Sequence, residues 1–435
     1  MTAVATIACR PGAPLSRHVV RLDWPGARSV QPRVTDSVPP RLLGLAQTDP
    51  AAPTTGAGAA SKFLFDALER RFRVVDRRSV DLGKPQRLLV AALTFHPNRQ
   101  RWTERFYFMG RLALNMRSRN SVRAVREASE PFDFAVQTFG LFHTRGAPYV
   151  LYIDNTAEIS HRQWPAWTPV SARALERLYA WERRLYGGAL HIFAQGRPHA
   201  ESVVSFYGVQ PERVSVVGGG ANFHPLPPLG SEPRGRIVLF VGGEWQRKGG
   251  DVLLEAFERV HMQMPEARLQ IVGTAEAPEG LPGVEVLGRI DDRERLADLY
   301  RHAAVFCLPS HFEPYGLSIA EAMVYGLPCV VTRVGALDEV VLDNETGLVV
   351  PPADPDALAG ALERLLRDPT LAERLGMAGR NRVELHQNWD AVAERMTPAL
   401  QRAADEVRAQ TLQRHTTEQP PRPGLPSRAG GGRRR

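Results

Sequence analysis

Lysine and cysteine are scarce in this chain, and long apolar runs are absent. Only three of its 435 residues are lysine and three are cysteine. No run approaches the roughly 20 apolar residues that span a bilayer, and the N-terminal residues lack the basic-then-apolar pattern of a secretory signal. The cysteines (Cys9, Cys307 and Cys329) have no metal-site spacing and form no disulfide framework, which favours a reducing cytoplasm. Cys307 and Cys329 lie in apolar runs and are expected to be small core residues.

Positive charge is concentrated at the two ends of the chain. The formal net charge is +8. Residues 412–435 contribute +5 and residues 1–38 contribute +3, so residues 39–411 are close to neutral. This distribution argues against specific nucleic-acid binding. We expect residues 1–38 to be a disordered lead-in and residues 412–435 a disordered basic tail, whose charge suits weak attachment to an anionic surface.

The middle of the chain alternates short apolar runs with longer helical patterns, which is typical of parallel sheets flanked by helices. This predicts two doubly wound α/β domains, at residues 39–225 and 236–388. A proline-rich break at 226–235 is the predicted linker, and residues 389–411 are predicted to form a helix that crosses back toward the first domain. Such folds bind ligands at the carboxyl ends of their strands.

Strands are predicted in both halves of the chain. In the first half they are expected at Arg41–Ala46, Arg87–Leu93, Asp133–Thr138, Tyr149–Ile153, Leu190–Ala194 and Val214–Val217, with a helix at Lys62–Phe72. In the second half they are expected at Ile237–Val241, Arg268–Val272, Val284–Leu287, Val305–Leu308, Cys329–Val331 and Leu348–Val350, with helices at Asp251–Met264, Pro355–Leu366 and Trp389–Arg408.

Residues 311–323 carry the strongest functional pattern. They follow a predicted strand and open a helix near Gly316. Free N–H groups at the positive end of a helix bind anions, and the residues predicted to form this cradle are Tyr315, Gly316, Leu317 and Ser318. Glu313 precedes the cradle, and Glu321 lies about two turns into the helix. A molecule made of a sugar, a diphosphate and a ribose would be bound by groups in this order. The first carboxylate would bind the sugar hydroxyls, the backbone N–H groups the diphosphate, and the second carboxylate the ribose diol.

The Glu-x7-Glu pattern from Glu313 to Glu321 is preceded by Pro309-Ser310 and followed by Gly326-Leu327-Pro328. It resembles the donor site of retaining glycosyltransferases of family GT4 (group 1). The resemblance covers residues 236–366 and is weaker over 40–225. The alternative is that both glutamates merely decorate a helix face.

The resemblance implies the GT-B fold, in which two Rossmann-like domains face each other across a cleft. It also implies transfer of a hexose-type sugar from a UDP-, GDP- or ADP-linked donor. The acceptor would be a hydroxyl of a glycan or a lipid-linked molecule, in polysaccharide or surface glycoconjugate synthesis.

Residues 240–250 form a second motif. In the resembled family, a Gly-Arg pair and a Lys-Gly pair place two cations on the donor diphosphate. Lys248 matches the family lysine, whereas Gly243 occupies the usual arginine position. We predict that Lys248 binds the diphosphate and that Arg247 supplies the missing charge. A solvated loop arginine is the alternative for Arg247.

The resemblance further implies retention by front-face substitution, in which the departing phosphate oxygen takes the acceptor proton. Negative charge builds on the leaving diphosphate in an oxocarbenium-like transition state. Fixed donors aimed at that group are the expected catalytic contribution. The predicted catalytic residues are Lys248, Glu313 and Asp154, with Asp154 orienting the acceptor hydroxyl.

No metal or other cofactor is expected. The string Asp354-Pro355-Asp356 matches the Asp-x-Asp of metal-dependent glycosyltransferases. Its position instead predicts a helix start, with Asp354 as the N-cap and Pro355 as the first helical residue. The resembled family is usually metal-independent.

The acceptor side has weaker signals. The predicted residues are Gly56, Gly58, His143, Asp154 and His161. The two glycines lie where the family often carries a Gly-rich loop, and a plain helix entry is the alternative. For the histidines a structural role is the alternative. Trp164 is a candidate acceptor wall, with core packing as the alternative.

Residues 101–126 form a basic segment that begins with aromatic residues. A helix of this kind suits the anionic inner face of a membrane, as a lipid-linked acceptor requires. Packing on its own sheet, with arginine stems over apolar surface, is the alternative. The expected location is the cytoplasm, with peripheral membrane contact.

Two rival functions stay open at this point. The Gly243 departure favours a catalytically silent nucleotide-sugar-binding protein. A GT-B sugar-nucleotide epimerase is the other rival, and it would differ from a transferase in having no second sugar as acceptor. A phosphorylase is disfavoured because none of the three lysines lies in an obvious setting for pyridoxal phosphate.

Overall fold

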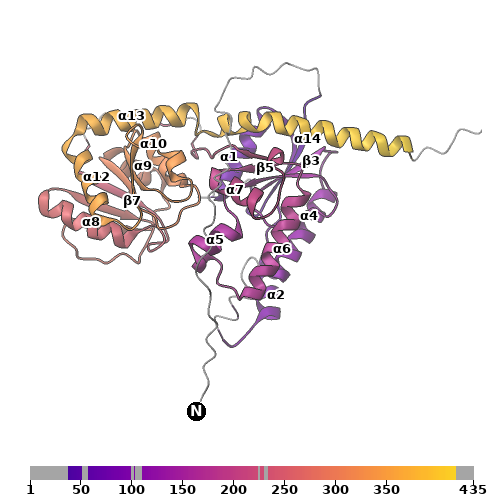
Figure 1. Ribbon diagram of the computed structural model, residues 1–435, viewed down its shortest axis with the longest axis horizontal. Coiled ribbons are helices and arrows are strands. Elements are labelled where there is room, and N and C mark those ends of the chain that lie inside the picture. Colours follow the sequence, from indigo (N-terminus) through magenta and orange to yellow (C-terminus); the bar gives the residue numbers. More distant parts are fainter. Residues whose placement is uncertain are drawn as a thin grey trace, which may run out of the picture. The chain divides into compact units, whose positions relative to one another are not determined.

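The computed structural model describes residues 38–50, 57–98, 102, 110–223, 226–229 and 234–417 (Figure 1). Several predictions lie outside the described residues. These are Cys9, Gly56, the lead-in up to residue 37, most of 101–109 and residues 418–435 of the predicted tail. The first residues of that tail, 412–417, are helical, because helix α14 continues to Thr417.

The first sheet has six parallel strands in the order β2-β1-β3-β4-β5-β6. The strands are β1 (Arg41–Ala46), β2 (Arg73–Ser79), β3 (Phe134–Thr138), β4 (Tyr149–Ile153), β5 (Ile192–Ala194) and β6 (Val214–Val216). The helices are α1 (Ala57–Glu69), α2 (Lys84–Thr94), α4 (Arg111–Arg126), α5 (Ala157–Gln163), α6 (Ala172–Gly188) and α7 (Arg197–Ser205). Every residue of β3 and β4 is buried, as expected for parallel strands covered on both faces.

The second sheet is also parallel, in the order β12-β11-β10-β7-β8-β9. Its strands are β7 (Ile237–Val241), β8 (Arg268–Val272), β9 (Val284–Gly288), β10 (Val305–Leu308), β11 (Cys329–Thr332) and β12 (Gly347–Val350). Its helices are α8 (Gly250–Gln263), α9 (Arg293–His302), α10 (Leu317–Val324), α11 (Leu337–Val340), α12 (Pro355–Arg367) and α13 (Pro369–Leu385), followed by α14 (Trp389–Thr417). Figure 1 shows α8, α12 and α13 around the sheet that contains β7.

One predicted strand is wrong. Residues 87–93 belong to helix α2, which has Pro85 in its first turn, and the edge strand is β2 instead. The apolar run of α2 resembles a buried strand, yet Leu88 and Leu93 are exposed. Strand β2 carries four charged residues among seven, so its sequence lacks the apolar alternation of a strand. Among the described strands it pairs with β1 alone, and an edge position tolerates such polarity.

Strand order determines where the second half can bind a ligand. The chain starts at the central strand β7, runs out to β8 and β9, and returns to β10 on the other side of β7. This reversal makes a topological switch point between β7 and β10, and a crevice opens beyond the carboxyl ends of strands at such a point. The two loops that leave these strands contain Lys248 and Glu313.

The last helix, α14, packs on the core of the first sheet. Its apolar residues Trp389, Met396 and Leu400 share a buried cluster with Leu64 and Leu68 of α1. Figure 1 shows α14 beside α1. Further along α14, Arg408 forms an ion pair of 2.7 Å with Asp133, just before β3.

Two local predictions are confirmed. Cys307 and Cys329 are fully buried in β10 and β11. Asp354 Oδ1 accepts a hydrogen bond of 2.9 Å from the Ala357 N–H, so Asp354 caps α12. None of the helices in the described ranges has the length and apolar character that a membrane crossing requires.

Candidate active site

Lys248 and Glu313 meet at the switch point. Lys248 Nζ lies 3.1 Å from Glu313 Oε2. The backbone of Gly249 makes this approach possible: its φ is 72°, and a Cβ there would lie 1.9 Å from the Pro309 carbonyl oxygen. Only glycine fits this position, because any side chain would push the Lys248 loop away from the end of β10.

Arg247 is buried beside this pair. Its Nη1 donates to the Phe312 carbonyl at 2.8 Å and to Glu313 Oε2 at 3.1 Å, while Nη2 donates to Glu244 Oε1 at 3.0 Å. The ring of Trp167 covers the guanidinium at 4.5 Å. The residue is only 5% exposed, so the alternative of a solvated loop arginine is wrong.

The charges around Glu313 favour its ionised form. Burial alone would raise the pKa of this carboxyl, but the nearby cations of Lys248 and Arg247 outweigh it, and the net pKa is lowered. The ammonium of Lys248 has three N–H donors, and Glu313 is the one acceptor found for it among the described residues. Donors therefore remain for an anion at this position.

The start of α10 adds backbone donors. Gly316 is its N-cap with φ 86°, and a Cβ there would lie 2.7 Å from Ile319 Cδ1. Within the described part of the chain, the N–H groups of Gly316, Leu317 and Ser318 find no backbone acceptor, and Ser318 Oγ is buried without a partner. Free N–H groups at a positive helix end attract anions.

Tyr315 has a structural contact of its own. Its side chain is buried, and its hydroxyl donates to the Gly219 carbonyl at 3.2 Å. The aromatic ring therefore fixes the cradle against the loop after β6.

Glu321 borders a cavity of 280 Å³ next to α10, with Gly273, Arg293 and Tyr325 among the other lining residues. Asn222 Nδ2 donates to Glu321 Oε1 at 3.3 Å. Burial raises the pKa of Glu321 to about 7, although Asn222 and nearby cations lower it in part. A ligand group with hydroxyls could donate hydrogen bonds to the Glu321 carboxylate.

Asp154 follows β4 and lines a second cavity, of 360 Å³, with Phe139, Trp167, Glu182 and Tyr186 among its walls. Burial, with a smaller contribution from the charge of Glu313, raises the pKa of Asp154 to about 6. Trp167 lines this cavity and also covers Arg247, which links the cavity to the Lys248 loop.

The predicted histidines are placed differently. The His143 ring packs on Trp181 at 4.7 Å, and burial, with Arg184 and Arg145 nearby, lowers its pKa. His161 Nδ1 lies 3.0 Å from Thr168 Oγ1. Neither histidine lines the cavity that holds Asp154.

The glycines differ in how much room surrounds them. Gly58 lies in the first turn of α1. A Cβ on Gly243 would meet only the Gly273 carbonyl oxygen, at 3.5 Å, which is ordinary contact. The position therefore has space for a side chain, although the sequence supplies none.

Three residues of the site were not anticipated. Glu244 accepts hydrogen bonds from both Arg247 and Trp167, the latter at 2.7 Å. Asn222 lies in a stretch that resembles a linker. Glu182 accepts from the Ala157 N–H and the Tyr186 hydroxyl, and burial raises its pKa to about 7. No local pattern marks them, because each acts through contacts with distant segments.

Part of the chain is similar in sequence to known glycosyltransferases. Residues 235–368 match the family model described as Glycosyl transferases group 1. Over 241 residues the chain is 32% identical to the D-inositol 3-phosphate glycosyltransferase of Streptomyces bingchenggensis, which covers 49% of this chain and 52% of that protein. The chain thus spans about half the length of this curated relative.

Solved structures match over more of the chain. Sucrose-phosphate synthase from Thermosynechococcus elongatus is 23% identical, with a TM-score of 0.61, and covers 86% of this chain and 100% of that one. The fold is GT-B. Anabaena HepE, solved in complex with UDP and glucose, is 16% identical with a TM-score of 0.57 and the same coverage.

Proposed function

We propose that this chain is a retaining glycosyltransferase of family GT4. It moves a hexose-type sugar from a nucleoside-diphosphate sugar to a hydroxyl of a glycan or a lipid-linked acceptor. The observation that carries the proposal is the meeting of Lys248, Glu313 and the start of α10 at the switch point between β7 and β10. The group 1 match over residues 235–368 supports it.

The donor would lie along the carboxyl end of the second sheet. Glu313 would accept hydrogen bonds from sugar hydroxyls, and Lys248 with the α10 amides would bind the diphosphate. Glu321 would accept from the ribose diol in the 280 Å³ cavity. UDP in the HepE structure supports a uridine donor, and GDP- and ADP-sugars are the other candidates.

This donor site defines the proposed domains. Residues 236–388 would bind the donor and residues 39–225 the acceptor, joined by a linker at 226–235. Residues 389–411 would tie the end of the chain to the first domain. The reaction would take place in the cytoplasm, where a lipid-linked acceptor is reached from the inner face of the membrane.

In the proposed reaction, the bond between the anomeric carbon and the phosphate oxygen breaks, and its electron pair goes to the diphosphate. Lys248 and the α10 amides stabilise the charge that forms there. The acceptor oxygen bonds to the anomeric carbon on the same face, and its proton passes to the departing phosphate oxygen. Asp154 orients the acceptor hydroxyl. Arg247 holds Glu313 in place through the hydrogen bond that its Nη1 donates to Glu313 Oε2.

A catalytically silent nucleotide-sugar-binding protein is the second candidate. The observation in its favour is Gly243, where the resembled family has a cation. This candidate binds a donor but does not break its anomeric bond.

The test is a panel of UDP-, GDP- and ADP-sugars, with binding measured by calorimetry and hydrolysis by nucleotide release, with and without EDTA. If the protein is a glycosyltransferase, one donor should bind and be slowly hydrolysed in EDTA, and Glu313→Ala should abolish this hydrolysis. Tight binding with no turnover of any donor would favour the silent binder. Binding of no donor would overturn both.

A further inference from the structure

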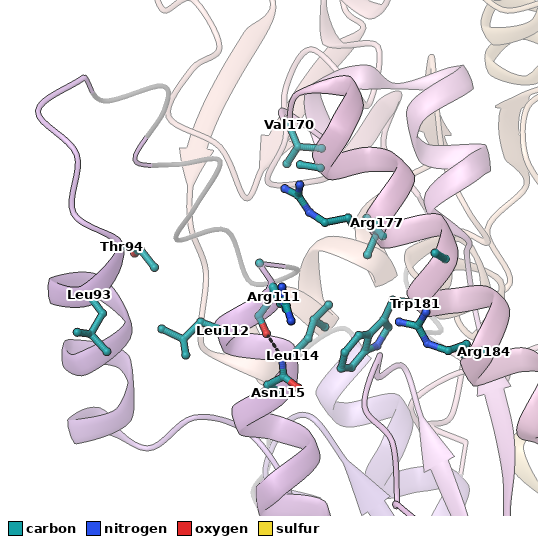
Figure 2. A pocket seen from close by; sticks show the side chains of 14 residues that line it. Leu93, Thr94, Arg111, Leu112, Leu114, Asn115, Val170, Arg177, Trp181 and Arg184 are labelled. Carbon is teal, nitrogen blue, oxygen red and sulfur yellow. Dashed lines mark hydrogen bonds between the residues drawn. The ribbon is translucent and has the colours of Figure 1, made fainter.

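A third cavity, of 510 Å³, lies among helices α2, α4 and α6 (Figure 2). Among the described residues, three arginines line it, and no aspartate or glutamate does. Arg111 comes from α4, and Arg177 and Arg184 come from α6. Figure 2 shows Trp181 between these α4 and α6 side chains.

The three arginines have no carboxylate partner among the described residues. Other arginines nearby are ion-paired, as Arg117 and Arg87 are with Asp81. All three side chains are exposed, so their guanidinium groups are available to donate charge-assisted hydrogen bonds to an anion. Arginine presents a planar set of donors that matches a phosphate group.

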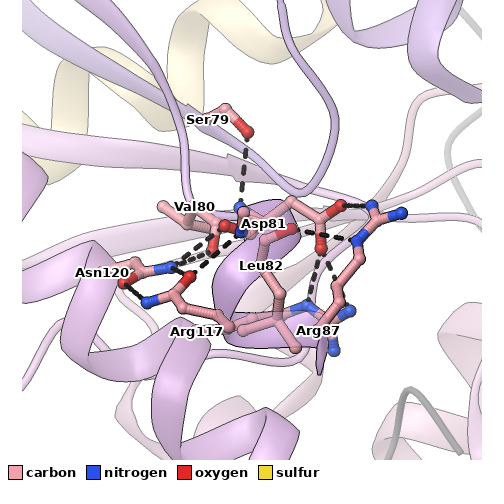
Figure 3. A network of polar contacts seen from close by, with 9 residues as sticks. Ser79, Val80, Asp81, Leu82, Arg87, Arg117 and Asn120 are labelled. Carbon is pink, nitrogen blue, oxygen red and sulfur yellow. Dashed lines mark hydrogen bonds and ion pairs between the residues drawn. The ribbon is translucent and has the colours of Figure 1, made fainter. Parts of the chain in front are cut away.

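The walls of the cavity are held by a polar network at the end of β2 (Figure 3). Arg117 of α4 is buried and donates to Asp81 Oδ1 through Nε and Nη2, at 3.2 and 3.1 Å. Asn120 Nδ2 donates to the Val80 and Asp81 carbonyls, at 3.2 and 3.0 Å. These contacts, together with a small apolar cluster between α2 and α4, fix both helices and therefore the shape of the cavity.

The cavity adjoins the one that contains Asp154. Leu114 lines both of them. Trp181 Nε1 donates to the Leu141 carbonyl at 3.1 Å, and Leu141 lines the Asp154 cavity. Helix α6 contributes walls to both, with Trp181 in the arginine-lined cavity and Glu182 and Tyr186 in the Asp154 cavity.

We infer that the arginine-lined cavity binds the phosphate or diphosphate group of an anionic acceptor whose hydroxyl lies near Asp154. This inference rests on the proposed function, because it names the class of acceptor for that site. The phosphate belongs either to a soluble sugar phosphate or to a lipid-linked carrier. The exposed apolar residues of α2 and its C-terminal end, Leu88, Leu93 and Phe95, offer a surface for a lipid chain beside the arginines.

Binding is tested with the donor site filled by whichever of UDP, GDP or ADP the protein binds. Glucose 1-phosphate and inorganic pyrophosphate are the soluble probes, measured by calorimetry. Phosphatidylcholine vesicles with and without polyprenyl phosphate are the lipid probe, measured by co-sedimentation. The test variant is Arg177→Glu/Arg184→Glu. The control is Arg119→Glu/Arg173→Glu, on the same two-helix surface with the same charge change but outside the cavity lining.

The inference predicts that at least one phosphate probe binds and that the test variant weakens it about 100-fold, since two charge-assisted contacts are lost. The control keeps wild-type affinity. If the test variant weakens binding of the soluble probes, the acceptor is a sugar phosphate. If it weakens only the binding of vesicles that contain polyprenyl phosphate, the acceptor is a lipid carrier. If the test variant unfolds, Arg177→Gln/Arg184→Gln replaces it.

The inference is overturned if no phosphate probe binds the wild type, or if the control loses as much affinity as the test variant. Failure of the proposed function looks different, because no nucleoside diphosphate then binds at all. In that case the phosphate probes are measured on the nucleotide-free protein.

Discussion

The ammonium of Lys248 lies 3.1 Å from Glu313 Oε2, although 65 residues separate the two in sequence. The pair joins the loop after β7 to the loop after β10, on the two sides of the point where the strand order reverses. In the proposed reaction these opposite charges have different targets: the carboxylate binds the sugar and the ammonium binds the leaving diphosphate.

Replacing Glu313 by glutamine should lower stability at neutral pH by about 3 kcal/mol, because it leaves the partly buried Lys248 ammonium unpaired and removes one of the two carboxylate partners of buried Arg247. The pKa of Glu313 is lowered in the folded protein, so its ionised form stabilises the fold above the ordinary value of 4.5. That contribution is lost as the pH falls through the lowered pKa. Denaturant unfolding of wild type and Glu313→Gln should therefore differ at pH 7 and converge in acid. A constant difference at every pH would contradict this.

Replacing Arg247 by methionine should separate binding from turnover. Because its donors hold Glu313, Glu244 and the Phe312 carbonyl, donor hydrolysis should fall by about tenfold or more. Affinity for the free nucleoside diphosphate should stay close to that of wild type. The exposed Arg295→Met serves as the control. A loss of nucleotide affinity as large as that of Lys248→Ala would make Arg247 a diphosphate ligand instead.

Nucleotide binding should release protons near neutral pH. The pKa of Glu321 is raised to about 7, so a share of this carboxyl is protonated there, and hydroxyl donors of a ribose favour its ionised form. Calorimetry in buffers of different ionisation enthalpy measures the release. Glu321→Gln should abolish it, whereas the exposed Glu276→Gln should retain it. Equal release from both variants would place the titrating group elsewhere.

Two glycines of the Lys248 loop should respond oppositely to alanine. Gly249→Ala should destabilise the protein, because φ is 72° and the new Cβ would lie 1.9 Å from the Pro309 carbonyl oxygen. Gly243→Ala should leave the melting temperature nearly unchanged, since only one atom lies within ordinary contact. Thermal unfolding of both variants checks this pair. Equal losses of melting temperature in the two variants would contradict the close approach of Gly249 to the Pro309 carbonyl.

Much of the fold was predictable because its strands are short apolar runs between turn residues. Strands such as Tyr149–Ile153 and Ile237–Val241 have the predicted bounds. Strand β2 and helix α2 were not predictable, because the first is polar at a sheet edge and the second carries exposed leucines.

The candidate site was predictable only where its residues form a local motif. Glu313, Glu321 and Lys248 lie in such motifs. The burial of Arg247 depends on Trp167, which is 80 positions away in the sequence, and no spacing rule reports that contact. The arginine-lined cavity likewise arises from α4 and α6, which only the folded chain brings together.

Donor hydrolysis by lysine variants shows whether Lys248 stabilises the leaving diphosphate. It is measured for wild type and Lys248→Ala, with the exposed Lys84→Ala as the matched lysine control. The account predicts that the wild type and Lys84→Ala hydrolyse the same nucleotide sugar at similar rates, and that Lys248→Ala is slower by about 100-fold or more, as expected when a donor to the leaving group is removed. Equal rates for all three proteins would contradict this role, because Lys248 would then not stabilise the leaving diphosphate in the crevice between β7 and β10.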